Sequence, residues 1–166
     1  MSENRKRESG SALFIAVMML VLMGALGIVA LNSVTTDRQV AGLQNRAISA
    51  FYTAEAGLAE ARSLVEDVGS RSSTPTFHTE ATPYQLGDAS LYAREGSQPL
   101  YYGDPAFPDP IRWIGDSGGG MAGGNLQVGR QKLMETLWQL NVIGESATGA
   151  RSRVEVVEIK VLSQGY

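Results

Sequence analysis

The sequence predicts an α+β protein in which a long N-terminal helix packs on a small C-terminal antiparallel β-sheet with long loops. Three observations support this class. Ser11–Leu31 is an uncharged apolar run, and the chain then continues to Val68 without a proline and with apolar residues every three or four positions. Alternating strand patterns are clearest near the C-terminus, after a middle rich in glycine and proline. We therefore expect a leader at 1–10, a helix at 11–68 and a β-rich domain at 69–166.

The composition limits the functions open to this chain. Its 166 residues suffice for one domain with an appendage. The net charge of −3 argues against a nucleic-acid-binding protein, which usually presents a basic face. The absence of cysteine excludes disulfides, thiolate metal sites and a cysteine nucleophile. The one histidine, His78, is expected at the surface, and no motif indicates an enzyme, a cofactor or a metal site.

The apolar run is long enough to cross a membrane. As a helix, Ser11–Leu31 is about 30 Å long, which matches the hydrocarbon core of a bilayer. Arg5, Lys6 and Arg7 precede it and predict a cytoplasmic N-terminus. A cleaved secretory signal would have a shorter apolar region followed by a small-x-small site, and no clear site of that kind follows here. A plain single-span anchor fits the same hydropathy and remains open.

An apolar stripe continues the helix beyond this run. The stripe consists of Val40, Leu43, Ala47, Phe51, Ala54, Leu58, Ala61, Val65 and Val68. A coiled coil is one explanation for such a long helix, but the stripe is short and rich in alanine. We expect instead that the C-terminal domain covers it. The main packing residues are expected to be Val40, Leu43, Phe51, Leu58 and Val65.

The C-terminal part predicts a β-hairpin. Lys132–Gly144 and Arg153–Leu162 are its strands, and Gly144–Gly149 is its turn. The alternation slips by one residue between Val156 and Val157, which predicts a β-bulge. Charged side chains of the second strand are then expected to face solvent or an edge: Arg153, Glu155, Glu158 and Lys160.

The middle of the chain is less regular. Short strands are predicted at Ser90–Arg94 and Ile111–Ile114. Tyr101–Pro110 and Asp116–Asn125 contain too many prolines and glycines for a helix or a central strand. The aromatic residues of this region either pack a loop-rich domain or form a partner-binding surface, and both interpretations remain open.

Three features at the N-terminus occur together. A basic leader ends in Gly10, the uncharged run begins directly at Ser11, and Ala50–Ala61 reads AFYTAEAGLAEA. This combination resembles the type IV pilus minor pilins of the PilX family. The segment 142–161, VIGESATGARSRVEVVEIKV, is similar to the closing hairpin of such proteins. The middle of the chain does not share the resemblance.

The resemblance implies a pilin-like fold and cleavage by prepilin peptidase between Gly10 and Ser11, followed by N-methylation of Ser11. Residues implied to pack in the membrane and then in the filament core are Leu13, Phe14, Ile15, Gly24 and Gly27. The implied partners are other minor pilins, the major pilin, a PilY-type tip adhesin, the peptidase and the inner membrane. The implied location is a single-pass inner-membrane protein with a periplasmic C-terminal domain, and then the pilus tip.

One departure from the wider family is informative. Most pilins carry glutamate at the fifth mature position, which is Ile15 here. A carboxylate inside hydrocarbon is costly unless it is paired, and in pilins it is thought to meet a neighbouring N-terminus. Its replacement by isoleucine argues against a major, repeating subunit. It suits a minor pilin that helps to initiate pilus assembly, while a type II secretion pseudopilin and an uncleaved single-span protein remain alternatives.

Overall fold

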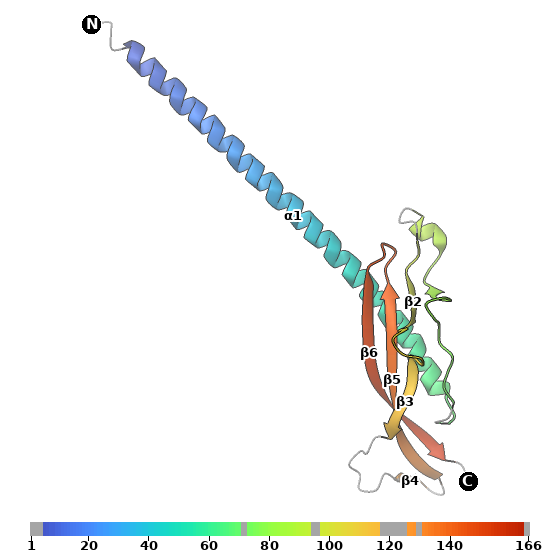
Figure 1. Cartoon of the computed structure of the whole chain (residues 1–166). Coiled ribbons are helices and arrows are strands. Elements are labelled where there is room, and N and C mark those ends of the chain that lie inside the picture. The colour runs from blue at the N-terminus through green and yellow to red at the C-terminus, as the bar shows by residue number, and fades with distance from the viewer. Residues whose placement is uncertain (1–4, 71–72, 94–96, 117–125, 129–130, 165–166) are drawn as a thin grey trace. The chain divides into compact units, whose positions relative to one another are not determined.

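The structure is a computed structural model that describes residues 5–70, 73–93, 97–116, 126–128 and 131–164 (Figure 1). Its elements in chain order are α1 (Arg5–Asp67), β1 (Tyr84–Gln85), a 3-10 helix (Ala89–Tyr92), β2 (Leu100–Gly103), β3 (Ile111–Asp116), β4 (Leu126–Val128), β5 (Gln131–Glu145) and β6 (Arg151–Gln164). The contacts divide the chain into two compact units, Met1–Gln44 and Asn45–Tyr166, and each is described by itself. The layout is the expected one of a long N-terminal helix and a small antiparallel sheet.

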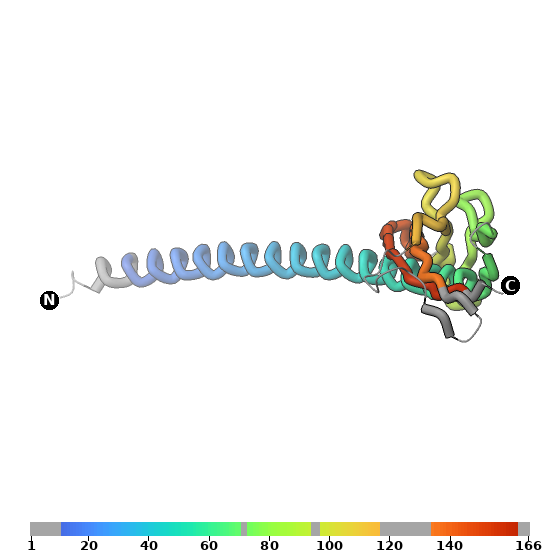
Figure 2. The backbone as a smooth tube through the Cα atoms, turned by 90° about the horizontal axis from the view of Figure 1, so that it is seen from below, coloured from blue at the N-terminus to red at the C-terminus, as the bar shows by residue number. Residues whose placement is uncertain are grey.

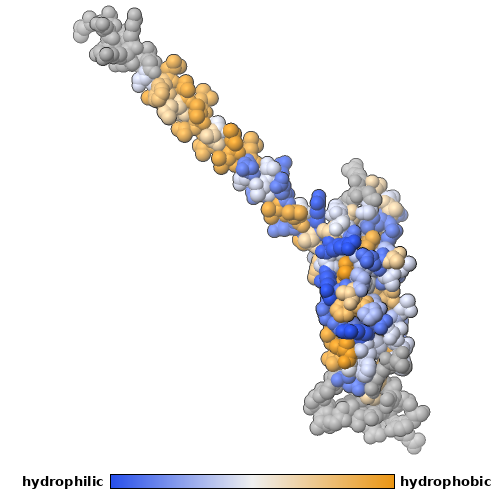
Figure 3. Space-filling model, in the orientation of Figure 1, coloured by the Kyte–Doolittle hydropathy of each residue, from blue (hydrophilic) through white to orange (hydrophobic). Residues whose placement is uncertain are grey.

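α1 is one uninterrupted helix, as Figure 2 shows. It begins at Arg5, inside the expected leader, and ends at Asp67, next to the expected end at Val68. All the side chains from Ser11 to Leu31 are exposed, and this part is orange in Figure 3. By length and composition α1 can cross a membrane, with a mean hydropathy of 2.8 in its most apolar window.

β5 is the centre of the sheet. Along one of its sides it pairs in succession with β2, β3 and β4, and β6 covers the other side. Every pairing is antiparallel, and β1 extends the sheet beyond β2. The predicted hairpin is therefore confirmed as β5 and β6. Its turn is closed by a hydrogen bond from Ser146 N to Ala150 O (2.8 Å), and Gly149 supplies the positive φ of 81°.

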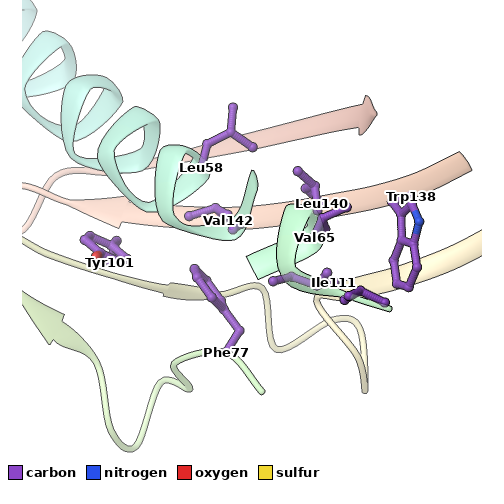
Figure 4. Close-up of a cluster of buried hydrophobic side chains, with 10 residues drawn as sticks. Leu58, Val65, Phe77, Tyr101, Ile111, Trp138, Leu140 and Val142 are labelled. Carbon is purple, nitrogen blue, oxygen red and sulfur yellow. The ribbon is translucent and has the colours of Figure 1, made fainter. Parts of the chain in front are cut away.

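The core lies between the inner face of the sheet and the last turns of α1 (Figure 4). Trp138, Leu140 and Val142 are fully buried, as the alternation of the sequence predicts, whereas Leu137 and Gln139 are partly exposed. Asn141, on the other face of the strand, is fully buried as well. Leu58 and Val65 from α1 contact the inner row of β5. Other members of the cluster are Ala61, Val68, Phe77, Tyr101 and Ile111.

Part of the expected stripe on α1 does not pack in this core. Leu58 and Val65 are buried, whereas Val40, Leu43 and Phe51 are 47%, 64% and 43% exposed. Val40 and Leu43 belong to the first unit, before the residues that the sheet covers. At Phe51 the buried face of the helix passes instead through its neighbour Ala50, because the backbone of β5 approaches too closely there for a large side chain.

β6 contains no bulge, which corrects the expected slip at Val156. Its pairing with β5 keeps one register from Glu145↔Arg151 to Lys132↔Gln164. Both faces of β6 carry branched apolar residues, and this mimics a change of phase in the sequence. Val154 and Val156 lie on the partly buried inner face, together with Glu158 and Lys160. On the outer, exposed face lie Val157, Ile159 and Val161.

Two expectations for the middle of the chain also need correction. The strand expected at Ser90–Arg94 is wrong, because its first three residues lie in the 3-10 helix Ala89–Tyr92. The Asp88 carboxylate caps this helix by accepting a hydrogen bond from Ser90 N (2.9 Å). Tyr101–Gly103 belongs to β2 and lies between β1 and β5, since the first proline of that stretch comes later. Ile111–Ile114 is a strand, as expected, within β3. Residues 94 and 117–125 of the expected strand and loop lie outside the described residues.

Candidate functional site

The expected processing site lies within α1. Gly10 and Ser11 are both helical, and Ser11 is exposed. The side chains of residues 1–10 lie outside the described part of the chain. A peptidase would therefore have to act on a peptide bond near the start of a helix.

The residues expected to pack in a membrane or filament are presented to the outside. Leu13, Phe14 and Ile15 are 69%, 65% and 53% exposed. A Cβ atom added at Gly24 or Gly27 would meet no other atom within 4 Å. Exposed apolar area costs about 25 cal/mol per Å² in water, so a segment of this kind needs an apolar cover.

In the second unit, two glycines set the distance between α1 and the sheet. A Cβ atom at Gly144 would lie 2.2 Å from Ala54 N and 2.5 Å from Ala50 O. A Cβ atom at Gly57 would lie 2.6 Å from the Tyr101 ring. The helix and β5 are thus in contact through backbone atoms, which fixes where the helix lies on the sheet.

A polar cluster lies beside this contact. The Tyr101 hydroxyl donates to Glu60 Oε2 (2.5 Å), and His78 Nε2 lies 3.2 Å from Glu60 Oε1. The rings of Phe77 and Tyr84 contact the rings of His78 and Tyr101. His78 is therefore half-buried and paired, not the surface residue that was expected. Sequence reasoning missed the cluster because its members come from four separate segments: α1, the loop that follows it, β1 and β2.

Ionisation of the Tyr101 phenol is expected to lower the free energy of unfolding at alkaline pH. Burial, and next the hydrogen bond to Glu60, raises the pKa of Tyr101 above its ordinary value of 10.0. The stabilisation is thus complete below about pH 10 and is lost as the pH rises toward the folded pKa, because only the unfolded chain ionises readily. We expect the free energy of unfolding of the wild-type chain, relative to Tyr101→Phe, to fall above about pH 10.

Urea unfolding of the full chain in detergent micelles between pH 7 and 11 measures this difference. Tyr52→Phe is the matched control, because Tyr52 is 64% exposed and should follow the wild-type curve. Parallel curves for wild type and Tyr101→Phe across this range would contradict the assignment of the shift to Tyr101.

Lys160 holds the end of α1. Its Nζ atom donates to the carbonyl oxygens of Val65 (2.6 Å) and Glu66 (2.5 Å) in the last turn, and to that of Val68 (2.6 Å) just after the helix. A cation at a helix C-terminus meets both the orphan carbonyls and the negative end of the helix dipole. The neighbouring Glu158 pairs with Arg62 at 3.5 Å. These two inner-face charges of β6 thus join the sheet to the helix.

On the outer face of the sheet, charged side chains pair with one another. Arg153 Nε lies 2.7 Å from Asp104 Oδ2, and the Asp104 side chain is almost fully buried. The guanidinium groups of Arg112 and Arg153 lie over the Phe107 ring at 5.2 and 5.3 Å from its centroid. These contacts hold the segment between β2 and β3 against the sheet.

The features described so far are contacts between α1, the sheet and the segment between β2 and β3. Within them, no group of three or more His, Cys, Asp or Glu side chains could hold a metal ion. A shallow hollow is lined by Gln85, Ala89, Tyr92, Ala93, Ser97, Gln98 and Leu100, which bring no charged side chain. In comparisons with protein families, curated proteins and solved structures, nothing matched this chain.

Proposed function

We propose that this chain is a minor pilin of the PilX type, which helps to initiate type IV pilus assembly as part of a tip or priming complex. It would be made as an inner-membrane precursor, cleaved after Gly10 and methylated on Ser11. Its partners would be other minor pilins, the major pilin, a PilY-type tip adhesin and the prepilin peptidase. Its role would be structural, through packing and not through catalysis.

One observation gives the proposal its main support. The uncharged run starts directly after Gly10 and continues, as one helix, into residues that form the core with an antiparallel sheet. A secretory signal ends at a cleavage site beyond its apolar region and does not share a helix with the folded domain. The continuity of α1 through Leu31 and Leu58 favours a helix that is kept in the mature protein.

The mechanism follows from the exposure of the first unit. Leu13, Phe14 and Ile15 would face lipid in the precursor and the apolar helices of neighbouring subunits in a filament. Gly24 and Gly27 would allow another helix to approach closely, because a helix surface without Cβ atoms is flat there. The second unit, held by its own core, would remain outside the membrane and meet the other tip proteins.

The N-terminal peptide of the purified protein tests this proposal. Mass spectrometry would compare native cells with a strain that lacks prepilin peptidase. We expect a methylated peptide beginning at Ser11 in native cells and an uncleaved leader in the deletion strain. A leader retained in both strains would refute the pilin interpretation and favour an uncleaved single-span protein. Cleavage beyond Leu31 would make the chain a soluble exported domain.

A type II secretion pseudopilin remains the second candidate, because it would share the cleavage and Ile15 in place of glutamate. The pseudopilin with an apolar residue at that position is usually much longer, which counts against this alternative. Deleting the gene distinguishes a role in the type IV pilus from a role in type II secretion. Loss of surface pili with normal secretion supports a minor pilin, and the reverse supports a pseudopilin.

A further inference from the structure

Asn141 is a fully buried polar residue on the outer face of β5. It is 0% exposed, whereas Gln139 and Ile143, two positions away on the same face, are partly exposed. Neither of its amide atoms, Oδ1 or Nδ2, has a hydrogen-bond partner within the described residues. A buried amide without a partner loses its bonds to water and gains none in return, so an asparagine at this place calls for a ligand.

The segment between β2 and β3, residues 104–110, covers this side chain. Both of its ends bond to the backbone of Asn141. Asp104 N donates to Asn141 O (3.1 Å), and Asn141 N donates to Pro110 O (2.8 Å). The segment therefore starts and ends beside the buried amide, and it is held to β5 at both places.

Phe107, in the middle of this segment, lies over the outer face of β5. The guanidinium groups of Arg112 and Arg153 are 5.2 and 5.3 Å from the centroid of its ring. Arg112 belongs to β3 and Arg153 to β6, and these strands pair with opposite sides of β5 (Figure 1). A phenyl ring between them shields the amide from bulk solvent and offers it no hydrogen-bonding atom.

Asp104 is the polar neighbour of Asn141 on the outer face, and it can accept a further hydrogen bond. Its side chain is 5% exposed. Oδ1 accepts from Ala106 N (2.9 Å), while Oδ2 lies 2.7 Å from Arg153 Nε in an ion pair that is not aligned as a hydrogen bond. An ionised carboxylate has about four lone-pair sites, so Oδ2 remains open to a donor.

We propose that internal water bridges the side chains of Asn141 and Asp104 beneath residues 104–110. With Nδ2 toward Asp104, a water molecule would accept from Nδ2 and donate to Asp104 Oδ2. With the amide turned over, it would donate to both Oδ1 and Oδ2, so water suits either orientation. The remaining amide atom would bond to a second water molecule. Internal waters in proteins usually serve buried polar groups of this kind.

Charged ligands fit this site less well. A metal cation would lie against the Arg153 guanidinium, which already pairs with Asp104. An anion would lie against the Asp104 carboxylate. The site combines a neutral amide, which both donates and accepts, with a carboxylate oxygen, and a neutral molecule that does both matches them. Such water would tie a side chain of β5 to the segment that covers it.

Nuclear Overhauser effects between water and the backbone amides test this proposal on the isotope-labelled full chain in detergent micelles. A water molecule that stays in place for longer than the protein takes to tumble gives negative effects, whereas surface water exchanges too quickly to do so. We expect negative effects at the amides around the site, those of Asp104, Ala106 and Asn141. Their absence at all three amides of the wild type would overturn the proposal without any substitution.

Asn141→Leu keeps the size of the side chain and removes both amide atoms, so the effects at Asp104 and Ala106 should be lost. Exchangeable protons of Arg153 and of the buried Tyr102 hydroxyl remain in this variant, so signals relayed by them would persist. Effects of equal size in Asn141→Leu would therefore overturn the proposal.

Two further variants complete the test. Asn45→Leu is the matched control, because Asn45 is exposed on α1, and it should keep the wild-type effects. Tyr102→Phe should keep them as well, and their loss there would assign them to the hydroxyl and overturn the proposal even if Asn141→Leu did not fold. None of these results depends on cleavage after Gly10, so the water site and the pilin function fail separately.

Discussion

Replacing Gly144 by alanine is expected to destabilise the second unit by about 3 kcal/mol. The added Cβ would lie 2.2 Å from Ala54 N and 2.5 Å from Ala50 O, and both are backbone atoms of α1. Backbone atoms cannot rotate away, so the helix would have to move off β5 and loosen the core at Val142 and Leu58. Urea unfolding of the full chain in micelles, followed by tryptophan fluorescence, measures the loss, because Trp138 is fully buried.

The control is Gly69→Ala, since a Cβ atom at Gly69 would meet nothing within 4 Å. Its unfolding midpoint should remain within experimental error of the wild type. The unfolding midpoint of Gly57→Ala should lie between those of Gly144→Ala and Gly69→Ala. Its added Cβ atom meets side chains and not backbone, and alanine is favoured over glycine in a helix by about 1 kcal/mol. A midpoint for Gly144→Ala equal to that of Gly69→Ala would show that α1 does not contact β5 in this way.

The helix and the hairpin could be predicted because their signals are local. The proline-free course from Ser11 to Asp67 and the alternation of Trp138, Leu140 and Val142 each depend on neighbouring residues in the sequence. Where two local readings were equally good, the sequence could not decide. Phe51 and Ala50 both continue a helical stripe, and only the close approach of Gly144 selects the smaller residue.

The strand β6 shows a second limit. A period of two identifies the faces of a strand only when one face is polar, and β6 carries valine on both. The continuous register with β5 places Glu158 and Lys160 inside and Val157 and Ile159 outside. The apolar outer face looked like a change of phase in the sequence, and in the structure it is a surface with no cover among the described residues.

The polar contacts could not have been predicted. Glu60, His78 and Tyr101 are far apart in the sequence, and nothing near them marks them as neighbours. The sequence around Lys160 is that of an ordinary exposed lysine, and only the fold brings its Nζ atom to the Val65 carbonyl oxygen. Gly57 did carry a signal, because a glycine inside a helix costs about 1 kcal/mol and usually has a packing reason.

Under the proposed function, replacing Gly10 by valine is expected to block processing completely, which would be the largest effect on function. By resemblance, the peptidase cuts the peptide bond that follows Gly10, and a branched side chain there would crowd the carbonyl under attack. The precursor would retain Arg5, Lys6 and Arg7 at the start of α1. Each charged side chain costs about 2.5–3.5 kcal/mol or more at the centre of a bilayer, so this helix end could not enter an apolar filament core.

Intact-mass measurement of the membrane-extracted protein would detect the retained leader, and the yield of surface pili would report the consequence for assembly. Gly27→Val makes the same chemical change in the same helix, at a position where a Cβ atom meets no neighbour. It should be processed as the wild type is, so any loss of pili in that variant would belong to helix packing and not to cleavage. Equal processing of Gly10→Val and Gly27→Val would show that the chain is not cleaved after Gly10. The uncharged run would then be better explained as a permanent anchor, because its length and exposure suit both roles and only the junction distinguishes them.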